Sequence, residues 1–200
     1  MKLIGEQTLI KLGKEIQFSF LSSGDIYQIL YQHNQINMYR GNLIDGGHSN
    51  IYLAVKNEGV TKLIGVSSPS TFSKNGDHVT YRGSFLEIEY QLDLIISRFG
   101  WRYKFRNLNK TSKEISLIYS QDVGLADVNS ILNSEAYTAQ YLDHQFKNQV
   151  LTSTQNQGVK QFLKFSSNKK IESYATDGLD FFGLGYKYSG IPDYLYKDLP

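Results

Sequence analysis

Alternation of apolar and polar side chains is the dominant pattern of this chain. The clearest run lies between Phe85 and Ile96. Apolar residues on one side are Ile88, Tyr90, Leu92, Leu94 and Ile96, and polar residues on the other are Glu87, Glu89, Gln91 and Asp93. A period of two residues is typical of a β-strand with one face in a core and one in water. This segment therefore predicts an amphipathic strand.

A second alternating run, from Trp101 to Arg106, follows the turn-like residues 97–100. A two-residue turn at Arg98 and Phe99 would place Ile96 opposite Trp101 and Asp93 opposite Lys104. Opposite charges across a strand pair contribute roughly 0.2–1 kcal/mol. The basic run is therefore interpreted as a structural partner of the acidic strand and not as a nucleic-acid patch. A third run at residues 115–119 would complete an antiparallel meander.

Shorter apolar runs between turn signals predict further strands. They cover residues 16–20, 26–31, 51–55, 61–65, 78–81, 161–165 and 181–188. Helical periodicity is weak, and residues 131–141 are the best candidate for a short helix. The pattern as a whole predicts an all-β fold, an antiparallel β-sandwich with few or short helices, formed as one domain by residues 1–200.

The composition excludes several classes of function. The chain has 21 basic and 19 acidic residues, so we expect no surface that binds nucleic acid or an anionic membrane. It has no cysteine, which excludes disulfides, thiolate metal sites and a cysteine nucleophile. The N-terminus lacks an apolar signal-peptide core, and no window approaches the roughly 18 apolar residues of a membrane span. We expect a cytoplasmic protein.

Residues capable of catalysis form no recognisable motif. The four histidines are far apart in the sequence and predict no metal site. Carboxylates gather in one segment as Asp122, Asp127, Glu135 and Asp143, but their spacing assigns none of them a catalytic role. Such residues commonly form turns or accept backbone hydrogen bonds. We therefore predict no catalytic residue.

The same carboxylate segment, IYSQDVGLADVNSILNSEAYTAQYLDHQ, is rich in Asn, Gln, Tyr, Asp and His. These side chains contact sugar hydroxyls and sugar ring faces. The segment is also longer than a hairpin connection requires, and long ordered loops are often functional. One hypothesis is a sugar-contacting loop at residues 133–144. The alternative is a loop that only packs the sandwich against other parts of a larger protein.

Three stretches carry a resemblance to a known family. They are GDIYQILYQHNQINMYRGNLIDGGHSNIYL, the carboxylate segment above, and ESYATDGLDFFGLGYK. In this order they resemble the N-terminal region of glycoside hydrolase family 94, also classed with glycosyltransferase family 36. Within that family the chain is similar to the 1,2-β-oligoglucan phosphorylases.

The resemblance implies a supersandwich of the galactose mutarotase-like type, followed in the family by a helical linker and an α/α barrel. In the family, an Asp of the barrel protonates the glycosidic oxygen while inorganic phosphate attacks the anomeric carbon with inversion. Phosphate is thus a co-substrate, and no other cofactor is implied. Because the barrel is absent from these residues, the resemblance implies a chain that is inactive alone and cut short within its sandwich.

Members of the family are usually homodimers, in which the corresponding segment can reach the substrate site of the partner subunit. The resemblance therefore implies a role for the carboxylate segment in substrate binding. The residues that match this role would bind the acceptor side of a β-glucan oligosaccharide, and they are Asn133, Glu135, Tyr137, Gln140, Tyr141, Asp143 and His144. One departure is that Ser134 separates Asn133 from Glu135, where the family pattern has Asn-Glu. A free-standing carbohydrate-binding module and a purely structural dimerisation domain remain alternatives, and the glucosidic linkage stays open.

Overall fold

The computed structural model describes residues 9–57, 59–67 and 69–196. These divide into two compact units. The first consists of residues up to 29 together with 40–121, and the second of residues 30–39 together with those from 122 onward. The chain enters the second unit within strand β3 (Ile26–Tyr31), returns to the first unit after Tyr39 and enters the second unit again after Gln121.

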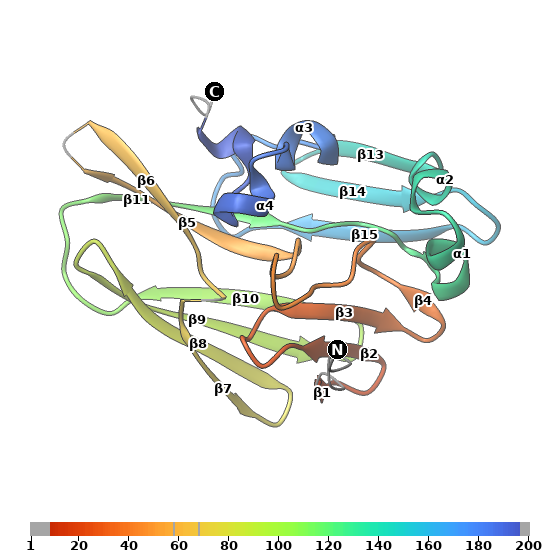
Figure 1. The fold of residues 1–200 in the computed structure, drawn as a ribbon, viewed down its shortest axis with the longest axis horizontal. Coiled ribbons are helices and arrows are strands. Elements are labelled where there is room, and N and C mark those ends of the chain that lie inside the picture. The colour runs from red at the N-terminus through yellow and green to blue at the C-terminus, as the bar shows by residue number, and fades with distance from the viewer. Residues whose placement is uncertain (1–8, 58, 68, 197–200) are drawn as a thin grey trace, which may run out of the picture. The chain divides into compact units, whose positions relative to one another are not determined.

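The first unit contains three groups of hydrogen-bonded strands (Figure 1). The largest is a four-stranded sheet in the order β10-β9-β8-β7, made of Gly100–Asn107, Ile88–Ser97, His78–Phe85 and Thr71–Asn75. A second has the order β11-β5-β6, made of Glu114–Ser120, Asn50–Asn57 and Val60–Gly65. The third contains β1 (Ile10–Leu12), β2 (Ile16–Phe20) and the start of β3.

Aromatic side chains fill the space between these sheets. Phe18 of β2 lies edge-on to Trp101 of β10, with ring centroids 5.3 Å apart. Tyr103 of β10 and Tyr119 of β11 are 5.4 Å apart. Phe18 and Phe20 are completely buried. The four-stranded sheet therefore packs its apolar face against the other two, which confirms the prediction of an all-β antiparallel sandwich.

The β9–β10 register agrees with the alternation of the sequence. Ile96 pairs with Trp101 and Asp93 pairs with Lys104 across a turn at Arg98 and Phe99. The expected water-facing position of Asp93 is wrong, because its side chain is only 3% exposed and forms its ion pair with Arg106. Burial raises the pKa of Asp93, but hydrogen bonds and neighbouring positive charge outweigh burial and lower it overall.

Two further expectations for this unit are wrong. The run from Phe85 to Ile96 is interrupted by a tight turn, in which Leu86 and Glu87 have φ angles of 48° and 67°. In addition, β11 pairs with β5 and not with β10, so the meander consists of β7, β8, β9 and β10. The connection of residues 108–113 is long enough to carry the chain to another sheet, and alternation within a strand says nothing about which strand it joins.

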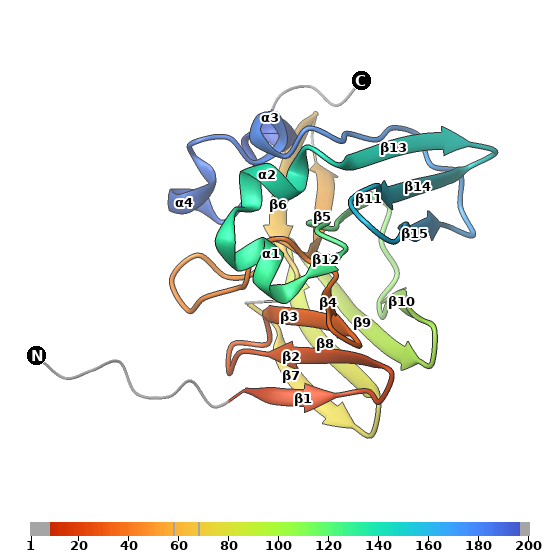
Figure 2. The same cartoon turned by 90° about the vertical axis from the view of Figure 1, so that its right-hand side faces the viewer.

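The second unit combines short strands and short helices (Figure 2). The end of β3 pairs with β4 (Asn34–Gln35), which pairs with β12 (Ala126–Asp127). Helices α1 (Val128–Asn133) and α2 (Glu135–Ala139) then lead into an antiparallel sheet. Its strands are β13 (Leu142–Lys147), β14 (Val150–Gln155) and β15 (Gln161–Ser166). The last elements are α3 (Gly178–Phe182), α4 (Tyr186–Ser189) and the 3-10 helix η1 (Asp193–Tyr196).

The strand expected at residues 181–188 is wrong, because these residues belong to α3, α4 and the turn between them. Asp177 caps α3 by accepting hydrogen bonds from the N–H groups of Leu179 and Asp180 at 2.9 and 3.1 Å. Gly183, with φ at 65°, ends the helix. The aromatic residues that suggested a strand instead pack against one another, as Phe182 and Tyr186 do edge to face with ring centroids 4.9 Å apart. Capping chemistry here overrides the strand propensity of aromatic residues.

Within the described ranges, no helix is both long and apolar enough to cross a membrane.

Candidate functional site

The segment expected to be a loop at residues 133–144 is a helical corner followed by a strand. Ser134 separates α1 from α2 and serves both. Its N–H donates to the carbonyl of Ser130 at the end of α1, and its Oγ accepts the N–H of Tyr137 at 3.2 Å in α2. Serine is a favoured N-cap residue. The helix expected over residues 131–141 is therefore present but broken at Ser134, the residue that departs from the family pattern.

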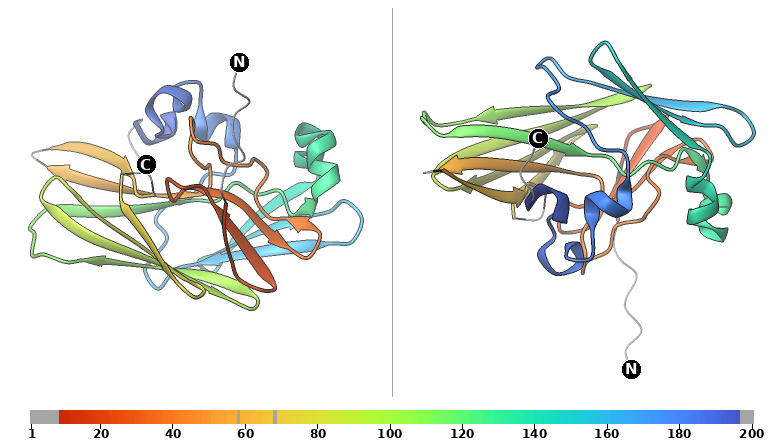
Figure 3. Two further views of the ribbon diagram at one scale, coloured as in Figure 1. Left: turned by 60° about the horizontal axis from the view of Figure 1, so that its bottom comes forward. Right: turned by 90° about the horizontal axis from the view of Figure 1, so that it is seen from above.

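A small apolar cluster lies beneath this corner. It consists of Met38, Ala126 and Ile131, with the partly buried Leu142 packed against it. Thr138 is completely buried, and its Oγ1 donates to the carbonyl of Ser134 at 2.9 Å. Asn133, Glu135 and Tyr137 are exposed on the outer side of the two helices. Figure 3 shows the two helices side by side next to the β13–β14–β15 sheet.

The structure brings two of the expected sugar-contacting residues together. The Tyr141 hydroxyl donates to the Tyr137 hydroxyl at 2.7 Å, and the two rings meet edge to face at 5.2 Å. This hydrogen bond is the main reason why the pKa of Tyr141 is raised. Tyr137 is 50% exposed. Glu135 precedes Tyr137 by two residues on α2 and is also exposed, so the corner presents an aromatic pair and a carboxylate.

Other expected residues are separated by the geometry of the strand. Asp143 and His144 are neighbours on β13 and therefore point to opposite faces of the sheet. Asp143 is exposed, whereas His144 is half-buried and its Nδ1 lies 2.8 Å from the Oγ of the buried Ser153. Burial lowers the pKa of His144. Asn133 and Gln140 are exposed at the ends of the two helices.

Asp122 belongs to the same site, although the sequence pattern did not single it out from the other carboxylates. Its Oδ2 accepts the N–H of Tyr39, 83 residues away, at 2.5 Å. The pKa of Asp122 is raised to about 7, and burial is the largest cause. The charge of Glu135 also raises this pKa, whereas backbone hydrogen bonds from Tyr39 and Met38 lower it. The pKa of Tyr39 is itself raised by burial and by Glu135 and Asp122.

This arrangement places Asp122, Tyr39 and Glu135 within electrostatic reach of one another. A carboxyl group that exchanges its proton near neutrality can both donate to and accept from a hydroxyl group. Only the fold could identify Asp122, because Tyr39 and Met38 come from a distant part of the chain. The site combines carboxyl, phenol and aromatic groups, which are side chains that can hydrogen-bond and pack against hydroxylated ligands.

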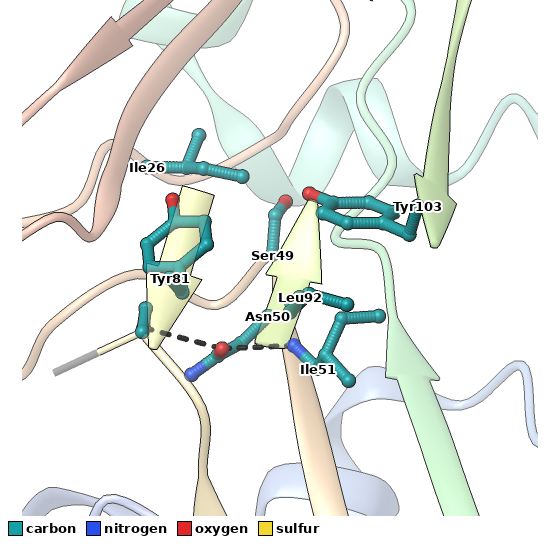
Figure 4. Close-up of a pocket in the computed structure, with 8 residues that line it drawn as sticks. Ile26, Ser49, Asn50, Ile51, Tyr81, Leu92 and Tyr103 are labelled. Carbon is teal, nitrogen blue, oxygen red and sulfur yellow. Dashed lines mark hydrogen bonds between the residues drawn. The ribbon is translucent and has the colours of Figure 1, made fainter. Parts of the chain in front are cut away.

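No metal-binding group of three or more His, Asp or Glu side chains occurs in the described part of the chain. A narrow cavity does occur inside the first unit (Figure 4). It has room for about one water molecule. Asn50 Oδ1 lies at its edge and accepts hydrogen bonds from the Ile51 N–H at 2.8 Å and from Ser67 Oγ at 3.2 Å. This cavity is too small for a sugar.

Comparison with known proteins identifies the family of the chain. Residues 19–200 match a protein family described as the SOGP N-terminal domain. The chain is also 28% identical over 207 aligned positions to a 1,2-β-oligoglucan phosphorylase of Listeria innocua serovar 6a. That alignment covers 96% of this chain and 19% of the relative, so the chain spans about a fifth of the relative's length. The resemblance seen in the sequence motifs is confirmed.

Proposed function

Because this chain belongs to the SOGP N-terminal domain family, we propose that it is the non-catalytic N-terminal region of an inverting β-glucan phosphorylase. In this proposal the complete enzyme cleaves β-1,2-oligoglucans with inorganic phosphate and releases α-glucose 1-phosphate. The similarity to the Listeria innocua phosphorylase supports the proposal. We further propose that the complete enzyme is a cytoplasmic homodimer.

The α1–α2 corner is proposed to contact the acceptor side of the glucan. The single observation that carries this role is the tyrosine pair of the exposed Tyr137 and the partly exposed Tyr141, joined by a hydrogen bond between their hydroxyls. Aromatic faces pack against the C–H surface of a pyranose ring, and a nearby carboxylate accepts from its hydroxyl groups. Glu135 supplies such a carboxylate, and a fixed corner loses little conformational entropy on binding.

Titration of the isotope-labelled chain with a β-1,2-glucotriose, followed by NMR, tests this role. We expect weak, millimolar binding that shifts the resonances of residues 135–141, because one exposed corner buries little sugar surface. Tyr141→Ala should abolish these shifts. Tyr188→Ala, which removes a tyrosine that is 94% exposed on α4, is the matched control and should leave them intact.

Each other outcome has a definite meaning. Absence of shifts in residues 135–141 contradicts the glucan-contacting role. Micromolar binding by the chain alone identifies the free-standing carbohydrate-binding module instead. Release of glucose 1-phosphate by the purified chain contradicts a non-catalytic region.

A second function, association with another protein surface, is favoured by a different observation. Leu179, Leu184 and Tyr188, in and around α3 and α4, are 88%, 91% and 94% exposed. Large apolar side chains at such exposure are typical of interaction surfaces. If the chain is a dimerisation domain, sedimentation should show a dimer that Leu184→Ser converts to a monomer, and Tyr141→Ala should leave glucan affinity unchanged.

A further inference from the structure

Gln155 at the end of β14 has an unusual set of partners. Its side chain is buried, with 1% of the residue exposed. The two N–H groups of its amide donate to the carbonyls of Gly124 and Thr138, each at 3.2 Å, and its Oε1 accepts the N–H of Gln157 at 3.1 Å. One side chain thus connects three segments that are separated in the sequence.

These partners are the points where the α1–α2 corner meets the rest of its unit. Gly124 lies just before β12, and its N–H donates to the carbonyl of Ile36 at 2.6 Å. A Cβ atom at Gly124 would lie 2.9 Å from the Cδ1 of Ile131, so α1 packs tightly over this position. Thr138 occupies the buried side of α2. The amide of Gln155 therefore joins the strand β14, the entry to α1 and the buried side of α2.

A second contact strengthens the same connection. The N–H of Asn156 donates to the carbonyl of Tyr141 at 2.9 Å, where α2 passes into β13. Buried carbonyls are costly when they lack a donor. The Gly124 carbonyl therefore requires a donor at this position, whereas the Thr138 carbonyl accepts from the Gln155 amide in addition to the N–H of Tyr141 at 3.3 Å. No apolar side chain of the same shape could meet this requirement.

We propose that Gln155 is the positioning residue of the α1–α2 corner, fixing Glu135, Tyr137 and Tyr141 in place relative to Asp122. Its consequence for glucan binding rests on the proposed function, whereas its effect on the corner does not. If the glutamine only stabilised the core, its replacement would lower the free energy of unfolding and leave the folded corner where it is.

Gln155→Met is the test, because methionine retains the length of the side chain and removes both donors. Gln145→Met is the matched control: Gln145 lies on the neighbouring strand β13, is exposed and forms only a 3.5 Å hydrogen bond with Asp143. The first measurement is the titration of Asp122 by carboxyl ¹³C NMR in the folded protein. The second is the dissociation constant for β-1,2-glucotriose.

In Gln155→Met we expect the pKa of Asp122 to move down from about 7 towards its ordinary value, because displacement of α2 uncovers the carboxyl and withdraws Glu135. We expect glucotriose to bind about tenfold more weakly. Gln145→Met should match the wild type in both measurements. If Gln155→Met does not fold, Gln155→Asn retains the amide one methylene shorter, reaches at most one carbonyl, and is judged by the same two measurements.

The outcomes separate this inference from the proposed function. An unchanged Asp122 titration in the folded variant overturns the positioning role. So does unchanged glucotriose affinity where the wild type binds. A shifted titration in a protein that binds no glucotriose, wild type included, supports the positioning role and refutes the glucan-contacting function.

Discussion

Replacement of Asp122 by asparagine should change how the stability of this protein depends on pH. The carboxyl accepts backbone hydrogen bonds from Met38 and Tyr39 and is close to Glu135, in a half-buried position. Asparagine preserves the shape of the side chain and one oxygen acceptor for the Tyr39 N–H. It removes the ionisation, so a difference between the two proteins isolates the effect of that charge.

The direction follows from proton binding. The pKa of Asp122 is 3.8 in an unfolded chain and about 7 in the folded protein. Between these values the folded state holds a proton that the unfolded state has lost, so stability falls as pH rises and is flat above pH 7. From pH 5 to pH 8 about two pKa units of this interval are crossed, which corresponds to about 2.7 kcal/mol. Water screens part of this electrostatic effect at a half-buried site, so we expect a loss of stability of about 1–2 kcal/mol between pH 5 and pH 8.

Urea unfolding of wild type and Asp122→Asn at pH 5 and pH 8 measures this effect. The wild type should lose about 1–2 kcal/mol relative to the variant between these two pH values. Groups titrating in both proteins, such as His48 and His144 with their lowered pKa values, cancel in the difference. Asp143→Asn, at an exposed carboxylate, should leave the profile parallel to the wild type. A difference between wild type and Asp122→Asn that does not vary with pH, or that grows in the opposite direction, would refute the reasoning.

Three further substitutions test the fold. Arg106→Met removes the guanidinium that pairs with the buried carboxylate of Asp93. Urea unfolding should show a destabilisation of about 2 kcal/mol. The double variant Arg106→Met with Asp93→Asn should largely recover the lost stability, because no buried charge is then left without its partner. Leu94→Ala creates a cavity at a completely buried position and should lower the free energy of unfolding by about 2–5 kcal/mol in the same assay. A smaller loss would show that the sheets collapse into the cavity. Ser134→Ala removes the N-cap of α2 and should cost about 1 kcal/mol with a loss of helical circular dichroism, whereas Ser134→Asp should retain both.

The errors of sequence-based prediction in this chain have specific causes. Phe181–Tyr188 was expected as a strand because aromatic residues favour strands, but Asp177 and Gly183 impose helix boundaries that a count of apolar residues does not register. Gln91 and Asp93 were expected in water because they alternate with apolar residues. In the folded protein they are 7% and 2% exposed and belong to a hydrogen-bonded network on the outer face of the sheet. Burial of a polar position depends on its neighbours across the sheet, which alternation within one strand does not describe.

The sequence alone determined the features that depend on residues close together in the chain. Strands β2 and β3 have the boundaries that their apolar runs indicate, and the β9–β10 register follows from a two-residue turn and a period of two. Local sterics and alternation specify such elements because the interacting residues are sequence neighbours. The family could be identified for a similar reason, since motifs are contiguous stretches of sequence.

Only the tertiary structure decided how the candidate site is assembled. Tyr39 and Asp122 meet across 83 residues, and Gln155 reaches Gly124 across 31. No pattern in the sequence connects such positions, because each contact depends on how strands and helices pack after they have formed. The raised pKa of Asp122 arises mainly from burial, against the hydrogen bond from the distant Tyr39, and burial is a property of the folded chain as a whole.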